Sequence, residues 1–176
     1  MRKLAIAALG LTLSSNAFAS DCEMTASIDF VESAPRDHVS IRHDSPTGWN
    51  MHSFSWELQG SKGDLIFDTV VGGPGYEVAQ PFEGSGTGRL AAAPTLADGD
   101  RQLSLSFQEF PSTASYRFTL DVDDRVSGRG GTMISGSEIS GSGLSVIMTS
   151  PDGEEFKMTG SFDESATAVL RGNCVR

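Results

Sequence analysis

Alternating hydrophobic and polar positions dominate this chain. In segments 24–30 and 52–58 every second residue is apolar, which is the period of a β-strand with one buried side and one solvent-facing side. Segment 116–122 is the clearest example, with four apolar residues on one side. Further strands are expected at 39–42, 64–71, 76–82, 103–107, 144–148, 156–162 and 167–170. The apolar phase of these segments predicts core positions at Phe54, Trp56, Leu105, Phe118 and Leu120.

Turn signals separate these strands. Ser150-Pro-Asp-Gly153 has the proline and glycine positions of a type I turn, and it joins two alternating segments as a hairpin. No window of eleven residues has an apolar stripe of helical period. About eight to ten short strands with little helix predict an all-β fold, a single antiparallel β-sandwich of immunoglobulin-like or jelly-roll type.

Two Gly- and Ser-rich segments interrupt the strand pattern. Residues 83–88 are expected to form a flexible loop, since no helix follows that would turn the glycines into a phosphate site. Residues 126–143 are expected to form a longer loop, with a weak edge strand around Met133–Ile134 or Glu138–Ile139.

The first nineteen residues have the pattern of a secretory signal peptide. Arg2 and Lys3 precede a short apolar run, and Ala17-Phe-Ala19 supplies a small-x-small cleavage pattern. We expect residues 1–19 to be removed, leaving 20–176 as one β-sandwich domain that is secreted or periplasmic. No second apolar stretch approaches the length of a transmembrane helix.

Cys22 and Cys174 are the only two cysteines, one near each end of the mature chain. An exported protein meets oxidising conditions, so a Cys22–Cys174 disulfide is expected. Two free thiols, or a bridge to another molecule, are the alternatives. Neither cysteine lies near a histidine or in a Cys-x-x-Cys motif, so a catalytic thiol is not indicated.

The formal net charge is −10, and loss of the signal peptide makes it more negative. This charge argues against nucleic acid or an anionic membrane as a partner, because both would be repelled.

Most motifs that carry chemistry are incomplete here. Phe67-Asp68-Thr69 resembles the start of an aspartic-protease motif, but Val70 replaces the required glycine and no second copy exists, so Asp68 is interpreted as a polar strand residue. His38, His43 and His52 lack the spacing of a zinc site, and His38 and His43 are expected in solvent.

An acidic cluster is the one candidate site. Asp121, Asp123 and Asp124 close the best strand, and Glu138 follows in the glycine-rich loop. Calcium takes six to eight oxygen ligands, which carboxylates at a strand end can supply, so these four residues are candidate calcium ligands. The spacing does not match an EF-hand, and solvated loop carboxylates are the interpretation that the sequence favours. No cofactor is required, and calcium is the only candidate ion.

Several blocks are similar to a family of exported bacterial proteins labelled "aggregation factor core protein". They are Glu32–Asp37, Asp64–Thr69, Tyr76–Phe82, Asp98–Asp100, Phe118–Asp124 and Ser135–Ile139. The resemblance implies a single immunoglobulin-like module, and the family's label implies adhesion. It supplies no catalytic residues. The terminal cysteines and the insertion after Asp124 depart from the family's pattern.

These observations predict an exported, non-catalytic binding module that acts in adhesion or cell-surface assembly, with an extracellular protein or polysaccharide as partner. Two alternatives remain open. One is a hydrolase or lyase of extracellular polymers, with Asp121, Asp123 and Glu138 as acid and base. The other is a secreted inhibitor that presents the loop Val71–Tyr76.

Overall fold

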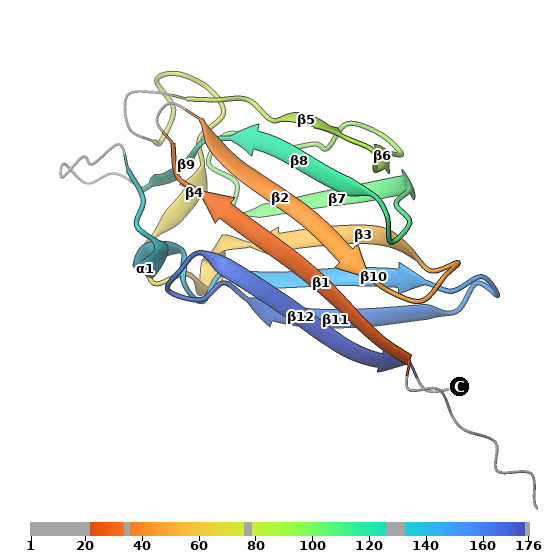
Figure 1. Ribbon diagram of the computed structural model, residues 1–176. Coiled ribbons are helices and arrows are strands. Elements are labelled where there is room, and N and C mark those ends of the chain that lie inside the picture. Colours follow the sequence, from red (N-terminus) through yellow and green to blue (C-terminus); the bar gives the residue numbers. More distant parts are fainter. Residues whose placement is uncertain (1–21, 34–35, 76–78, 126–132, 175–176) are drawn as a thin grey trace, which may run out of the picture.

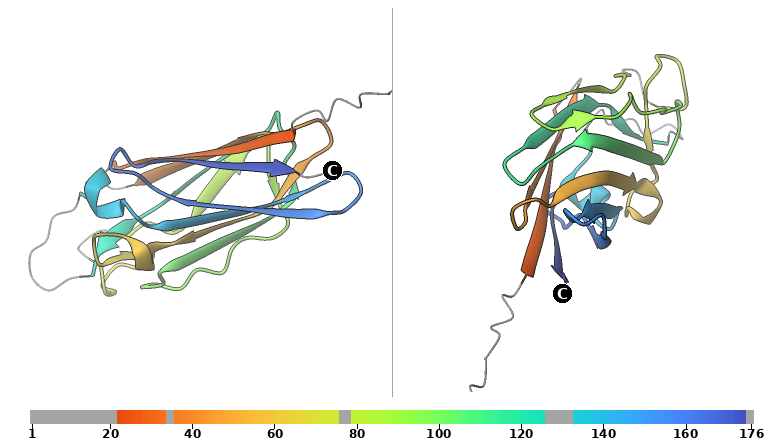
Figure 2. Two further views of the ribbon diagram at one scale, coloured as in Figure 1. Left: turned by 90° about the horizontal axis from the view of Figure 1, so that it is seen from below. Right: turned by 90° about the vertical axis from the view of Figure 1, so that its right-hand side faces the viewer.

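Two five-stranded antiparallel sheets pack face to face, as the alternating pattern predicts (Figures 1 and 2). The structure is a computed structural model that describes residues 22–33, 36–75, 79–125 and 133–174. The predicted signal peptide therefore lies outside the described residues. Within them, no helix has the length and hydropathy needed to cross a bilayer.

Sheet A has the strand order β12-β1-β2-β8-β5, and sheet B has the order β11-β10-β3-β7-β6. A separate two-stranded sheet pairs β4 with β9. The strands of sheet A are β1 (Cys22–Val31), β2 (Asp37–Asp44), β5 (Glu83–Gly86), β8 (Ser115–Leu120) and β12 (Thr167–Cys174). Those of sheet B are β3 (Asn50–Glu57), β6 (Arg89–Leu90), β7 (Gln102–Glu109), β10 (Gly143–Thr149) and β11 (Glu155–Ser161). The remaining elements are β4 (Leu65–Phe67), β9 (Val122–Asp124), the 3₁₀ turn η1 (Leu58–Gly60) and α1 (Gly136–Ile139).

The core between the sheets is built by the inward positions of each strand. The five residues predicted for it are all at most 2% exposed, which confirms the strand phases. Trp56 lies at its centre in edge-to-face contact with Phe67 and Phe162, at ring distances of 5.2 and 5.6 Å. The Trp56 indole donates to Ser142 Oγ at 3.1 Å, so its polar atom is satisfied inside the core.

The predicted hairpin between β10 and β11 is present. Gly153 N donates to Ser150 O at 3.0 Å, and Gly153 has a φ of +84° that favours glycine.

Two of the expected strands differ from the structure. The strand expected at 64–71 is limited to β4, and residues 79–82 form no strand, while 76–78 lie outside the described residues. The segment expected as a flexible loop instead begins with β5, at the edge of sheet A. A Cβ at Gly84 would collide with the Tyr116 hydroxyl. Glycine thus lets this edge strand lie directly against β8, which is why the composition was misleading.

The long strand expected at 116–122 is interrupted at Asp121. Residues before it pair with β2 and β5, whereas residues after it pair with β4. Asp121 N donates to Gln80 O at 3.3 Å, and Asp121 O accepts from Asp68 N at 3.0 Å. Asp121 therefore occupies the junction between sheet A and the small β4–β9 sheet.

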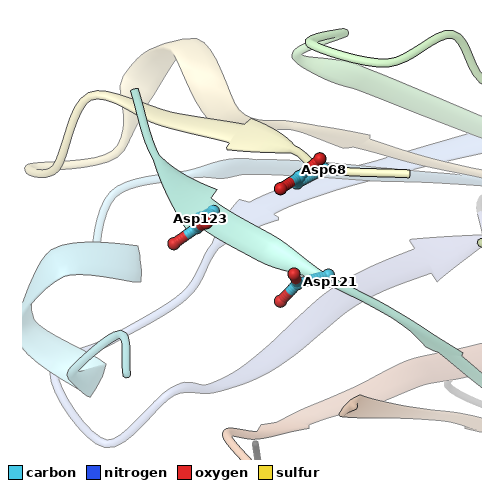
Figure 3. A group of neighbouring side chains, drawn as sticks. All are labelled: Asp68, Asp121 and Asp123. Atoms are coloured by element: carbon cyan, nitrogen blue, oxygen red, sulfur yellow. The ribbon is translucent and has the colours of Figure 1, made fainter. Parts of the chain in front are cut away.

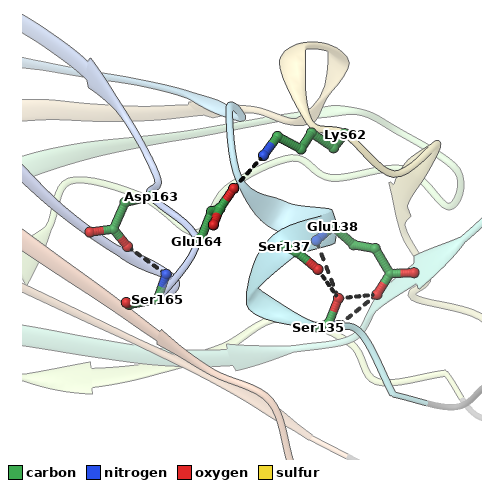
Figure 4. A network of polar contacts seen from close by, with 7 residues as sticks. All are labelled: Lys62, Ser135, Ser137, Glu138, Asp163, Glu164 and Ser165. Carbon is green, nitrogen blue, oxygen red and sulfur yellow. Dashed lines mark hydrogen bonds and ion pairs between the residues drawn. The ribbon is translucent and has the colours of Figure 1, made fainter.

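The weak edge strand expected around 133–134 or 138–139 is wrong, because residues 133–134 form no strand and Gly136–Ile139 form the single-turn helix α1. Ser135 and Glu138 make a reciprocal capping box. Ser135 Oγ accepts from Glu138 N at 3.3 Å, and Glu138 Oε2 accepts from Ser135 N at 2.7 Å (Figure 4). Beside α1, Lys62 forms an ion pair with Glu164 at 2.8 Å.

Candidate metal centre

Three aspartates from different parts of the chain converge at one end of the sandwich (Figure 3). Asp68, Asp121 and Asp123 each place a carboxylate oxygen within 4.8 Å of the others. They are the only group of this kind found among the described residues.

The β4–β9 pairing brings these residues together. Phe67 is the register partner of Val122, so Asp68, just after β4, comes to lie beside Asp121. The main chain fixes this position, because Asp68 N donates to Asp121 O at 3.0 Å. Asp123 lies two residues further along β9, which places it on the same side of that strand as Asp121.

Burial makes this cluster different from a group of surface carboxylates. Asp68 is 2% exposed and Asp123 is 3% exposed. Asp68 Oδ1 is buried and has no hydrogen-bond partner among the described residues. A buried carboxylate oxygen without a partner is costly, so it needs either a proton or a cation.

The cost is visible in the pKa of Asp68. Burial, a hydrogen bond with Asp98 and the charges of Asp98 and Asp123 together raise this pKa to about 6. Asp98 is held in place because its Oδ1 accepts from Thr69 N at 2.8 Å and from Val70 N at 3.2 Å.

Asp121 is affected in the same direction. Burial and the charges of Asp123, Asp68 and Glu32 raise its pKa to about 7. A divalent cation would reverse both effects, because it favours the ionised form of every carboxylate around it.

A loop passes directly over these carboxyl groups. A Cβ at Gly75 would collide with the Asp68 carboxyl group, and one at Gly73 would collide with that of Asp98. The same loop exposes Val70 and Val71, by 59% and 74%. Its inner side therefore lies against Asp68, one member of the cluster, and against Asp98. It includes most of the predicted inhibitor loop Val71–Tyr76, of which Tyr76 lies outside the described residues.

The distances suit a calcium ion. Ca–O distances of about 2.3–2.6 Å mean that two ligand oxygens on opposite sides of one ion lie at most about 5 Å apart. The three aspartates fall within that limit. Calcium takes six to eight oxygens, so main-chain carbonyls or water would complete the shell.

Of the four sequence-predicted ligands, the structure gathers two. Asp121 and Asp123 join Asp68, which the sequence interpretation treated only as a polar strand residue. Asp124 is not a member of this group; burial raises its pKa, and the charges of Glu138, Asp123 and Asp64 raise it further. Glu138 Oε2 already accepts from both Ser135 N and Ser135 Oγ in the α1 capping box.

A second carboxyl group is buried nearby, at the start of β2. Asp37 is 2% exposed, and its oxygens accept from Ser33 N at 3.3 Å and Val122 N at 2.9 Å. Burial, together with a hydrogen bond and the charge of Glu32, raises its pKa to about 9. Asp37 therefore stays protonated at neutral pH and helps to anchor the start of β9.

The histidines do not gather into a site. His38 and His52 are exposed, whereas His43 is buried, which corrects the expectation that His43 lies in solvent. Its Nε2 lies 2.8 Å from Phe110 O and its Nδ1 lies 3.1 Å from Ser45 Oγ. Burial lowers its pKa, so it is a neutral core residue.

The two cysteines lie at the opposite end of the sandwich from β4 and β9 (Figure 1). Cys22 and Cys174 are register partners across β1 and β12. Directly opposed residues of an antiparallel pair have Cα atoms about 4.5–5.5 Å apart, within the range that a disulfide spans.

Comparisons with known proteins identify no relative. Neither the protein-family models, nor the curated proteins, nor the solved structures give a match to this chain.

Proposed function

We propose that this protein is an exported, non-catalytic binding module of adhesion or cell-surface assembly, and that Asp68, Asp121 and Asp123 hold a calcium ion in it. The observation that carries the cation site is Asp68 Oδ1, a buried oxygen without a hydrogen-bond partner in the described part of the chain, within a cluster of three carboxylates. The signal-peptide pattern and the resemblance to the aggregation factor core proteins support export and adhesion.

Burial favours cation binding over acid–base catalysis at this cluster. A hydrolase or lyase would need its carboxyl groups in a cleft that a polymer can enter. Asp68 and Asp123 are almost fully enclosed, and the loop at Gly75 lies against Asp68. A small ion that arrives through water can be held there, whereas a polymer cannot reach both carboxyl groups.

The ion would link separate elements of the fold. It would join the end of β4 to the β8–β9 junction and remove the repulsion between three carboxylates. Outside the cell, even the affinities of about 10⁻⁴–10⁻³ M that are typical of extracellular modules give substantial occupancy. A Cys22–Cys174 disulfide at the other end, which the strand register favours, is the second cross-link in this proposal.

The test is thermal unfolding of residues 20–176 at pH 8, in EDTA and in rising calcium. A ligand that binds only the native state stabilises it by RT ln(1 + [L]/Kd), about 1.4 kcal/mol at ten times Kd. The midpoint of wild-type protein should therefore rise with millimolar calcium. Asp68→Asn and Asp123→Asn should each abolish the rise.

Matched variants separate this site from general charge effects. Asp124→Asn and Glu138→Gln should keep most of the calcium response, because these side chains lie outside the cluster. Asp152→Asn, an exposed residue of the hairpin turn, should keep all of it. Asp68→Asn should unfold in EDTA at no lower temperature than wild type, since it removes a buried charge. A wild-type midpoint that ignores calcium, or an equal rise in Asp68→Asn, would contradict the proposal.

A further inference from the structure

A surface groove crosses the outer face of sheet A. It has a volume of about 690 Å³ and is lined by residues of β1, β2, β8 and β5. Neighbouring strands lie about 4.8 Å apart, so the four strands span roughly 14 Å. The groove is therefore wide enough for a chain-like ligand that lies across the strands.

Arg117 lies at the centre of this groove. Its register partners are Ser40 on β2 and Ser85 on β5, so a hydroxyl group flanks it on each side. Arg117 is exposed, and its guanidinium makes no ion pair or hydrogen bond with any described residue.

The two carboxylates among the residues that line the groove, Asp29 and Glu83, already have partners. Asp29 pairs with Arg42 at 3.2 Å and also accepts from Ser40 Oγ at 3.3 Å. Glu83 pairs with Arg36 at 3.5 Å. The groove therefore keeps one guanidinium whose charge no carboxylate of the described chain offsets, within a protein of strongly negative net charge.

The exposed polar side chains Ser85 and His38 line the groove together with this guanidinium, whereas the Thr119 hydroxyl lies below the surface. Thr119 lies two residues along β8, between His38 of β2 and Glu83 of β5. Its hydroxyl is buried and has no hydrogen-bond partner in the described part of the chain. The exposed His38 ring also faces the groove. These groups suit a ligand that carries many hydroxyl groups.

The apolar contribution to the groove is small but present. Val31, at its rim, is 56% exposed, whereas the side chains of Val39 and Phe118 are buried in the core on the other side of the sheet. Among the described residues that line it, none offers an exposed aromatic ring as a stacking platform. Recognition would therefore depend on polar groups, with the guanidinium as the strongest of them.

We propose that this groove binds a saccharide chain that carries carboxylates, with the Arg117 guanidinium holding one carboxylate. The planar fork of arginine matches a carboxylate in a bidentate geometry that lysine cannot reproduce. Ser85 and His38 would bond the ring hydroxyls around that carboxylate, and Ser40 Oγ, which donates to Asp29, could accept from one of them. This proposal rests on the proposed binding role of the protein, and it does not require the calcium ion.

The experiment measures the affinity of residues 20–176 for a galacturonate trimer by calorimetry in EDTA. The trimer's methyl ester, which differs only in its carboxylates, should bind at least about tenfold more weakly, the size of one charge-assisted pair. Arg117→Gln should lose a similar factor for the trimer, and Arg117→Lys should lose less. Acetate and a glutamate tripeptide should bind more weakly than the trimer.

Arg125 supplies the matched control, because it too is exposed and its side chain forms no ion pair with the described residues. Arg125→Gln should keep the wild-type affinity. An equal affinity of wild type and Arg117→Gln, or of trimer and ester, would overturn the proposal, as would no binding at millimolar trimer. Tighter binding of acetate would assign the groove to small carboxylates, and tighter binding of the tripeptide would assign it to acidic peptides. Because calcium is absent, failure here leaves the calcium titration to be judged separately.

Discussion

At the scale of single residues, this molecule is defined by carboxyl groups that it buries at one end. Asp37, Asp68 and Asp121 each have a raised pKa, for which burial is the largest cause. Evolution of a stable sandwich alone would favour apolar side chains at such positions, since unpaired buried charge is costly. Several buried acids in one place therefore make stability depend on pH.

We predict that the unfolding free energy in EDTA falls between pH 5 and pH 8. The native pKa of Asp37 is about 9, above the ordinary value of 3.8. The unfolded chain therefore loses this proton first as pH rises, and the native state holds more protons. Stability that is complete below about pH 4 is lost as pH rises towards 9, by up to about 1.4 kcal/mol per pH unit.

Asp37→Asn isolates this contribution. Asparagine copies the protonated acid, with an oxygen for Val122 N and an amide that can donate to Glu32. The decline between pH 5 and pH 8 should be shallower in this variant, as measured by urea unfolding at several pH values in EDTA. Equal slopes in wild type and Asp37→Asn would mean that Asp37 titrates normally.

The limits of sequence interpretation are also clearest at single residues. The pattern of Asp121 and Asp123 at a strand end identified two members of the cluster. Asp68 was missed because it lies 53 positions before Asp121 in the chain, and only the β4–β9 register unites them. A carboxylate directly after the fully buried Leu65–Phe67 was the available signal. The sequence also contained a signal for the helix-capping role of Glu138, because Ser-x-x-Glu predicts a capping box.

At the scale of elements, strands with one buried and one exposed face were located well, whereas the strand containing β4 was predicted too long and β5 was expected as a loop. β1, β3, β7, β8 and β10 alternate because one side meets water and the other meets the core. β4 is buried at all three positions, so it has no alternation to detect. β5 is exposed at all four positions, and the missing Cβ of Gly84 leaves room for the Tyr116 hydroxyl.

β8 tests this distinction directly, because one of its faces is buried and the other is exposed. Leu120 is fully buried, so Leu120→Ala should lower the unfolding free energy by about 2–5 kcal/mol. Arg117→Gln, on the outer face of the same strand, should cost less than about 0.5 kcal/mol. Chemical denaturation measures both. A loss below about 0.5 kcal/mol for Leu120→Ala would contradict the packing of β8.

At the scale of the whole molecule, the two proposed cross-links, the calcium ion and the disulfide, lie at opposite ends of the sandwich (Figure 1). Calcium would join β4 to the β8–β9 junction, while a Cys22–Cys174 bridge would join the first and last strands. The groove of Arg117 lies on the outer face of sheet A, and its lining reaches Thr119, two residues before Asp121. This separation predicts that the two cross-links contribute independently to the unfolding free energy.

The disulfide prediction is tested first by intact mass. Protein exported from its native host, alkylated without reduction, should carry no label, and reduction should expose two thiols. Two labelled thiols before reduction would rule out the bridge. A bridge that closes a loop of about 150 residues has a chain-entropy ceiling near 5 kcal/mol, and loss of native disulfides typically costs about 2–5 kcal/mol.

The rise in unfolding free energy that calcium causes then distinguishes independent cross-links from coupled ones. Cys22→Ser with Cys174→Ser should lower the unfolding free energy in EDTA, because the unfolded chain gains freedom when the bridge is absent. The rise caused by a fixed calcium concentration should stay within about 0.5 kcal/mol of the wild-type rise, since distant sites without shared partners are additive. Asp68→Asn should show the reverse pattern, with no calcium increment and an unchanged loss on reduction. A calcium increment that disappears in the serine variant would mean that the bridge organises the far end of the sandwich, and the two sites would then be one cooperative unit.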